Sequence, residues 1–275
     1  MLRFNKTDIE YLEDMANLIR KDVITMIHEA GSGHPGGSLS AADIMTALYF
    51  HTLNLDPQNP KWEDRDRFVL SKGHCCPAYY ACLARRGYFT VKAIHTLRKY
   101  GSILQGHPDM LLTPGVDITS GSLGNGLALG MGMALSARYH NQTYHTYVLM
   151  GDGEIQEGMI WESAMAAGTY HLDNLTGIVD CNGLQINGWV NDIVQLEPLV
   201  DKWKAFGWHV IEINGNLMEE ILFALHEART IKGYPTVILA RTIKGKGVSF
   251  MEDNKDWHGK APNDSEFSRA MAELD

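Results

Sequence analysis

The sequence has little positive charge and no basic run. Its 24 lysines and arginines are outnumbered by 33 aspartates and glutamates, which gives a net charge of −9. Nucleic acids and anionic membrane surfaces usually require a positive footprint on their partner. We therefore expect neither partner, although a small anionic ligand needs only a local cluster of donors.

Cysteine is also scarce, and its spacing carries no motif. The four cysteines form neither a CxxC pair nor a zinc-like spacing. Long apolar runs are missing too, since residues 123–137 are apolar but contain Asn125 and several glycines and are too short to span a bilayer. The amino-terminal segment resembles an amphipathic helix rather than a signal peptide. A cytoplasmic protein with reduced thiols follows from these absences.

The apolar residues that are present predict an α/β fold. They make up 45% of 275 residues, enough for one large domain over residues 1–275. Short apolar runs are continuous, as in strands that are buried on both faces. They lie at Phe68–Ser71, Tyr147–Met150, Gly177–Cys181, His209–Ile213 and Thr236–Ala240. Helical segments alternate with them, at residues 8–30, 40–52, 75–86, 91–100, 123–139, 155–170, 197–206 and 217–231.

This alternation predicts a doubly wound, mainly parallel sheet with helices on both faces. Ligands of such folds collect where strands end and helices begin. Residues 242–262 lack periodicity and are rich in glycine and lysine. They form either a mobile loop over a site or a surface connection to a final helix.

The first of the motifs that carry chemistry is Gly151-Asp152-Gly153, between a predicted strand and a helix. Glycines let the chain turn sharply and let a ligand approach, and a helix N-terminus offers free N–H groups to an anion. A carboxylate beside an anion requires a cation between them, and Mg²⁺ takes oxygen ligands from both. The alternative is an ordinary tight turn.

A second polar element follows the next strand, in the run IVDCNGLQINGWV. If the two strands are neighbours, their carboxyl ends face the same crevice. Asn182 then offers an amide oxygen and Leu184 a backbone carbonyl. A simple Asn-Gly turn is the alternative here.

Together these two elements are similar to the signature of thiamine-diphosphate enzymes. By that resemblance Asp152, Asn182 and the Leu184 carbonyl would hold Mg²⁺, or Ca²⁺ or Mn²⁺ in its place. Gly151 and Gly153 would lie against the cofactor diphosphate.

Further segments resemble those of transketolases, in the same order and over nearly the whole chain. The segments are GSGHPGGSLSAADIM with His34, SKGHCCPAYYACLARRGYF with His74, LQGHPDM with His107, SGSLGNGLALGMGMA with Gly121 and Leu123, and RTIKGKGVSFMED followed by WHGKAP, with Lys244 and His258. A helix capped near Ser38 or Ser40 is expected in the first of these segments.

The resemblance implies roles for these residues. The four histidines would be the catalytic group, bonding to the diphosphate and the sugar hydroxyls; for any one of them alone, a core histidine is the alternative. Lys244 would add charge near the diphosphate, unless it is a solvated loop lysine. Gly121 and Leu123 would lie along the thiamine and also begin a helix. Glu157 and Glu162 would lie where paired active sites meet, the alternative being a solvent-facing helix surface.

Gly126, Gly130 and Ala134 recur at four-residue spacing on one predicted helix. Small residues at this spacing favour close packing against another helix, and a subunit interface is one use of such packing.

The resemblance covers only the diphosphate-binding domain of transketolases. It therefore implies a partner, a C-terminal subunit with the pyrimidine-binding half, in an α₂β₂ assembly. The activity implied is transfer of a two-carbon ketol unit between sugar phosphates.

Rival interpretations remain within and outside this class. They are a 2-oxo-acid dehydrogenase subunit, a 1-deoxyxylulose-phosphate-synthase-like enzyme, a transketolase for an unusual pentose, and a non-catalytic cofactor-binding subunit. A nicotinamide-dependent dehydrogenase is a further alternative, but this sequence lacks the GxGxxG motif that such an enzyme needs after its first strand.

Overall fold

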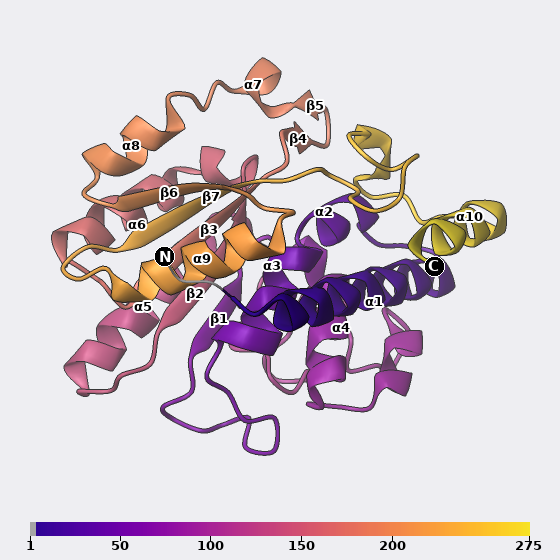
Figure 1. The fold of residues 1–275 in the computed structure, drawn as a ribbon, viewed down its shortest axis with the longest axis horizontal. Helices are drawn as coiled ribbons and strands as arrows, with labels where there is room; N and C mark the ends of the chain where they lie inside the picture. Colours follow the sequence, from indigo (N-terminus) through magenta and orange to yellow (C-terminus); the bar gives the residue numbers. More distant parts are fainter. Residues whose placement is uncertain (1–3) are drawn as a thin grey trace.

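A five-stranded parallel sheet crosses the computed structural model, which describes residues 4–275 (Figure 1). The first three residues of the predicted domain lie outside this description. The strand order is β1-β2-β3-β7-β6. The strands are β1 (Arg67–Leu70), β2 (Thr146–Gly151), β3 (Leu175–Cys181), β6 (His209–Asn214) and β7 (Thr236–Arg241). All five are predicted strands, with small shifts of their ends.

Both faces of the sheet are apolar because successive side chains of each strand point to opposite sides. Phe68 and Leu149 belong to one buried cluster, whereas their neighbours Val69 and Val148 belong to another. The first cluster includes residues of α1 (Lys6–Ala30), α2 (Pro35–Ser40), α3 (Ala42–Ala47), α4 (Cys76–Arg86) and α9 (Met218–Thr230). The second includes residues of α5 (Asn125–Tyr139), α6 (Gly158–Thr169) and α8 (Leu199–Ala205). The predicted doubly wound architecture is confirmed.

Several helix predictions need correction. The segment predicted as one helix over 40–52 is broken into α3 and a π-helical turn, Leu48–Thr52, after the end of α2 at Ser40. The segment 91–100 forms only a 3₁₀-helix, Val91–Thr96. The expected serine caps are wrong, because α2 begins at Pro35, a residue suited to the first helical position. Ser38 instead donates from within the helix to the His34 carbonyl.

Residues 242–262 are not a surface connection. The Gly245 N–H donates to the Gly36 carbonyl, 2.9 Å away, so the segment packs on α2. Val248 and Met251, which belong to this segment, are buried. It leads to α10 (Asp264–Leu274), which starts with a capping box between Asn263 and Glu266.

The sequence analysis missed a small hairpin after β3. It consists of β4 (Leu184–Gln185) and β5 (Gly188–Trp189), and α7 (Val190–Ile193) follows it. Figure 1 shows this hairpin beyond the carboxyl ends of the central strands. The Asn187-Gly188 dipeptide was a sequence signal for such a turn.

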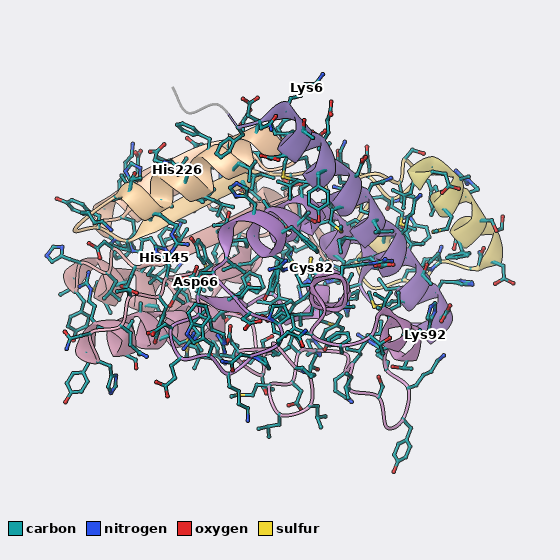
Figure 2. The ribbon with its side chains drawn as sticks, turned by 60° about the horizontal axis from the view of Figure 1, so that its bottom comes forward. Lys6, Asp66, Cys82, Lys92, His145 and His226 are labelled. Atoms are coloured by element: carbon teal, nitrogen blue, oxygen red, sulfur yellow. The ribbon has the colours of Figure 1, made fainter. Side chains whose placement is uncertain are left out.

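The amino end of the sheet is closed by internal polar contacts. Asp66 and His145 lie close together there (Figure 2), and the His145 N–H donates to the Asp66 carboxylate at 2.8 Å. The other Asp66 oxygen accepts from Arg229 at 2.9 Å. No helix within residues 4–275 is long and apolar enough to cross a membrane.

Candidate functional site

A cavity of about 410 Å³ lies at the carboxyl ends of β1, β2 and β3, where open α/β sheets bind ligands. The residues predicted from the sequence to bind cofactor, metal or sugar all line it. These residues are His34, His74, His107, Gly121, Leu123, Gly151, Asp152, Gly153, Glu157, Asn182, Leu184, Lys244 and His258. Residues far apart in the sequence thus converge on one concave surface.

Asp152 occupies the turn that follows β2 and is 6% exposed. Its carboxylate accepts hydrogen bonds from the N–H groups of Gly153, at 2.8 Å, and Gly183, at 2.6 Å. Burial, followed by the nearby charge of Asp180, raises the pKa of Asp152 to about 6, and the two N–H groups oppose this rise. The positive groups near Asp152 therefore do not compensate for burying its negative form beside Asp180.

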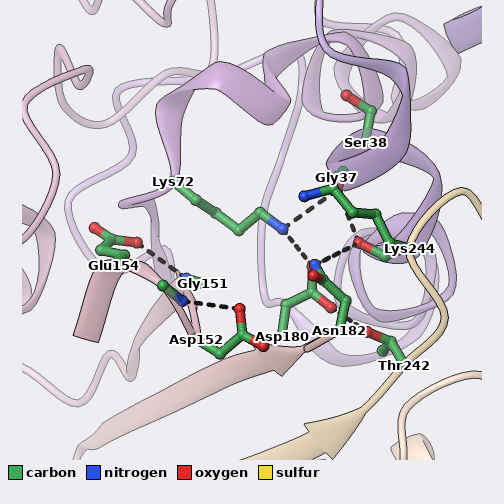
Figure 3. A network of polar contacts seen from close by, with 12 residues as sticks. Gly37, Ser38, Lys72, Gly151, Asp152, Glu154, Asp180, Asn182, Thr242 and Lys244 are labelled. Carbon is green, nitrogen blue, oxygen red and sulfur yellow. Dashed lines mark hydrogen bonds and ion pairs between the residues drawn. The ribbon is translucent and has the colours of Figure 1, made fainter. Parts of the chain in front are cut away.

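The second predicted element meets the first, as expected for neighbouring strands. Gly151 of β2 pairs with Asp180 of β3, so Asp152 and Asn182 follow adjacent strand ends (Figure 3). The Asn182 amide nitrogen lies 3.2 Å from the Asp180 carboxylate. The Leu184 carbonyl accepts from the Lys244 ammonium group at 2.8 Å.

The donor set fits a hard divalent cation. Asp152, Asn182 and Leu184 place carboxylate, amide and carbonyl oxygens on one cavity, and Mg²⁺ and Ca²⁺ prefer such ligands. A cation beside Asp152 would also favour its negative form, which burial and the charge of Asp180 disfavour. No cluster of three or more His, Cys, Asp or Glu side chains suited to a metal is found in residues 4–275. The proposed ligands, with a single carboxylate, are a different kind of set.

Three of the histidines form a triangle in the cavity. Ring centroids of His34 and His74 are 5.2 Å apart, those of His34 and His258 are 5.5 Å apart, and those of His74 and His258 are 5.3 Å apart. His107 contributes from the opposite loop, where an added Cβ on Gly121 would lie 3.3 Å from its ring. Among the described residues, the buried Nδ1 of His34 has no hydrogen-bond partner, as expected of a group that awaits a ligand.

These histidines are neutral near pH 7. Burial, with the charges of Arg98 and other nearby groups, lowers the pKa of His34 to about 4. Burial and the Lys244 charge lower the pKa of His258 to about 3. The pKa values of His74 and His107 are lowered as well, again chiefly by burial. The histidines therefore act as neutral donors and acceptors.

Two buried lysines supply the positive charge of the cavity. Burial and the neighbouring Lys72 lower the pKa of Lys244 to about 8. Its ammonium group lies 3.0 Å from His258 Nδ1, so the alternative of a solvated loop lysine is wrong. Burial opposes the charge of Lys72, but the ion pair with Asp180 raises its pKa above the ordinary value. Among the described residues Lys244 has no carboxylate partner, so its charge suits a diphosphate, whereas the charge of Lys72 is offset by Asp180.

The sequence analysis missed Lys72, Glu154 and Asp180. The Glu154 carboxylate accepts from the N–H groups of Gly124, at 2.9 Å, and Gly151, at 3.0 Å, and so ties the start of α5 to the end of β2. Asp180 carried a signal, because a charged residue inside a fully buried strand needs a partner. Lys72 stands in the same motif as His74.

A larger cavity of about 570 Å³ lies beside β6 and β7. It includes Arg241 and Lys246, whose charges are paired with Glu197 and Glu252, among others. It lacks the neutral histidines and the unpaired polar group of the first cavity. We therefore take the smaller cavity as the functional site.

Comparison with known proteins agrees with this geometry. Residues 12–274 match the family described as transketolase, thiamine diphosphate binding domain. Human transketolase is 40% identical over 264 residues, which are 94% of this chain and 42% of the human protein. The chain belongs to the transketolase family. A solved transketolase from Campylobacter jejuni subsp. jejuni NCTC 11168 matches with a TM-score of 0.91 at 33% identity, covering 97% of this chain and 43% of that one.

Two relatives in the transketolase family are close to this chain in length. The 6-deoxy-6-sulfo-D-fructose transketolase subunit SqwG of Clostridium sp. (strain MSTE9) is 46% identical over 264 residues, 96% of each protein. One subunit of the apulose-4-phosphate transketolase from Phocaeicola vulgatus is 43% identical over 266 residues, 97% of this chain and 94% of that protein. The resemblance to the N-terminal part of transketolases is confirmed.

Proposed function

We propose that this chain is the cofactor-binding subunit of a two-subunit transketolase. The enzyme transfers a two-carbon ketol unit from an anionic ketose to an aldose phosphate. The observation that carries the proposal is that Asp152, Asn182 and Leu184 line one cavity together with two lysines and four histidines. We also propose that residues 1–275 form one diphosphate-binding domain. The cytoplasmic location stays a prediction from the sequence.

Residues of opposite charge bind different parts of the cofactor. Asp152, Asn182 and the Leu184 carbonyl hold a divalent cation, while Lys244 binds diphosphate oxygens. Thiamine diphosphate, when bound, supplies the carbanion stabilisation needed to break and form a carbon–carbon bond beside a carbonyl. The protein binds, orients and shields the reacting groups from water.

The histidines recognise the sugar. His34, His74 and His258 are close enough together to contact neighbouring hydroxyl groups of one polyol. With His107, they donate or accept hydrogen bonds as charge develops on the substrate oxygens. Neutral rings suit this role, because each presents one N–H donor and one acceptor.

The substrate class follows from the relatives. One is named for 6-deoxy-6-sulfo-D-fructose and the other for apulose 4-phosphate. Both sugars carry an anionic group, a sulfonate or a phosphate. We therefore propose a phosphorylated or sulfonated ketose as donor, and an ordinary pentose phosphate is the second candidate.

A partner subunit is proposed because two relatives that this chain matches over nearly their whole length are named as subunits. Exposed apolar side chains on α5 and α6 also support it, with Leu129 45%, Met159 43% and Met165 54% exposed. Glu157 and Glu162 are exposed on the same segment. An α₂β₂ assembly buries this surface.

Calorimetric titration of thiamine diphosphate into the chain tests the site directly, with and without Mg²⁺ and the candidate partner. Binding that requires Mg²⁺ is expected. Asp152→Ala should weaken it by at least about tenfold, or 1.4 kcal/mol. Glu219→Ala removes an exposed carboxylate of α9 and should leave it unchanged. No binding by the wild type in any combination would remove the cofactor from the proposal.

Activity of the reconstituted enzyme separates a catalytic subunit from a merely structural one. His258→Asn should lower the rate of ketol transfer by about 100-fold or more if the ring takes part in proton transfer. An unchanged rate would favour a non-catalytic cofactor-binding subunit. Full ketol transfer by the isolated chain would contradict the need for a partner.

A further inference from the structure

Asp180 lies at the centre of a buried polar network behind the cavity (Figure 3). It is 0% exposed on β3. Its carboxylate accepts from Ser40 at 2.6 Å, from Asn182 at 3.2 Å, and from Lys72 and Thr242. These donors stand at the ends of α2, β3, β1 and β7, so one carboxylate joins four segments.

The network fixes the orientation of the Asn182 amide. A carboxylate can only accept hydrogen bonds. The amide nitrogen must therefore face Asp180, since the amide oxygen would be repelled there. The same nitrogen lies 3.4 Å from the Ser40 hydroxyl. The amide oxygen is left on the other side, where it accepts from the Leu184 N–H at 3.2 Å.

We propose that Asp180 is a positioning residue for the cation site. By holding the Asn182 nitrogen, it presents the Asn182 oxygen as a ligand beside Asp152. This rests on the proposed function, which places a divalent cation at Asp152 and Asn182. Partners that orient metal ligands typically affect metal affinity by 10- to 100-fold.

Asp180 itself is not a ligand. It is absent from the residues that line the cavity, and its two oxygens are occupied by donors. The Asn182 nitrogen, Ser40 and Lys72 share one oxygen, whereas Thr242 bonds the other. The two oxygens can therefore be tested separately.

Mn²⁺ binding, followed by electron paramagnetic resonance, tests the proposal in the full chain with thiamine diphosphate and the partner. Asp180→Asn should raise the Mn²⁺ dissociation constant at least tenfold, because a neutral amide no longer dictates which way Asn182 faces. Thr242→Val removes only the bond to the other oxygen and should change the constant less than threefold. A wild-type constant in Asp180→Asn would overturn the proposal.

A double variant separates positioning from folding. Asp180→Asn leaves Lys72 buried without its partner, which lowers stability. Lys72→Met combined with Asp180→Asn should restore the melting temperature, while Mn²⁺ binding stays weak. Recovery of Mn²⁺ affinity in the double variant would show that the Lys72 charge, and not the Asn182 orientation, was responsible. If the wild type binds no Mn²⁺, the proposed cation site itself fails.

Discussion

Burial gives some histidines of this chain an uncharged state at neutral pH. In the cavity this concerns His34, His74, His107 and His258, whose pKa values are all lowered. Positive charge is thus left to the two lysines, which suits a site that must hold an anion and a polyol together. The lowered pKa values also mean that the folded state becomes less stable at acidic pH, because the rings take up protons when the chain unfolds.

His145 shows this effect away from the cavity. It lies at the amino end of the sheet, where Nε2 is 2.7 Å from the Thr176 hydroxyl. Burial, followed by the charge of Arg229, lowers its pKa to about 3. Below the unfolded pKa of about 6.5 the unfolded chain binds more protons than the folded one. Stability is therefore complete above pH 6.5 and falls as the pH drops towards 3.

Urea unfolding between pH 7.5 and 4.5 measures this loss. Each histidine of this kind should contribute up to about 1.4 kcal/mol per pH unit below 6.5. His145→Gln should make the curve shallower by about one proton. An unaltered slope in His145→Gln would show that this ring takes up no proton on unfolding.

At the scale of elements, α5 shows how glycine lets a helix approach the sheet. The spacing of Gly126, Gly130 and Ala134 predicted close packing, and all three are buried. Their main neighbour is not another helix, however. An added Cβ on Gly126 would overlap Ser71, and one on Gly130 would overlap Val148. At these glycines α5 packs directly on the β1 and β2 side of the sheet. The expectation of helix–helix contact through them is therefore wrong.

Gly130→Ala should therefore lower the free energy of unfolding by about 1–3 kcal/mol through overpacking. Gly132 on the same helix is the matched control. Its added Cβ would meet no described atom within 4 Å, so Gly132→Ala should raise stability by about 0.5–1 kcal/mol. Chemical denaturation of both variants gives the comparison. Equal effects of the two changes would mean that helix propensity, rather than contact with Val148, sets the result.

The strands were predictable because their signal is local. Continuous apolar runs bounded by turn residues mark β1, β2, β3 and β7, which are buried on both faces. β6 lies at the edge of the sheet, and its buried and exposed residues alternate, so the expected burial on both faces is wrong for this strand. The residues that line the cavity could be named because they stand in glycine-flanked motifs, while their roles in binding and catalysis stay predictions. Asp180 and Lys72 were missed because their importance depends on a pairing between residues that are distant in sequence. Where α2 ends and α3 begins was also hidden, since no proline or glycine marks the break at Ser40.

At the scale of the molecule, the functional residues occupy one side of a three-layered body. Leu123 lines the cavity and is 40% exposed. Apolar side chains of α5 and α6 are also uncovered, although the opposite faces of both helices are buried in the second core cluster. Exposed groups of this kind near a site are typical of protein interfaces.

The proposed association predicts that α6 is part of the contact. Met165→Asp places a charge where an apolar side chain is 54% exposed. It should weaken binding of the partner or of a second copy by at least about tenfold, or 1.4 kcal/mol. Because the side chain is exposed in the isolated chain, the melting temperature should change little. Light scattering of the mixed subunits measures the association.

Phe223→Asp provides the control on the other side of the sheet. Phe223 belongs to α9 and is 46% exposed. Both substitutions therefore replace a half-exposed apolar side chain with a charged one, but on opposite faces of the sheet. Loss of association in Met165→Asp alone would locate the contact at α6, beside the cavity. Loss in Phe223→Asp alone would move the contact to α9. The cavity would then have to be complete without a neighbouring subunit, and thiamine diphosphate should bind the isolated chain as tightly as it binds the assembly.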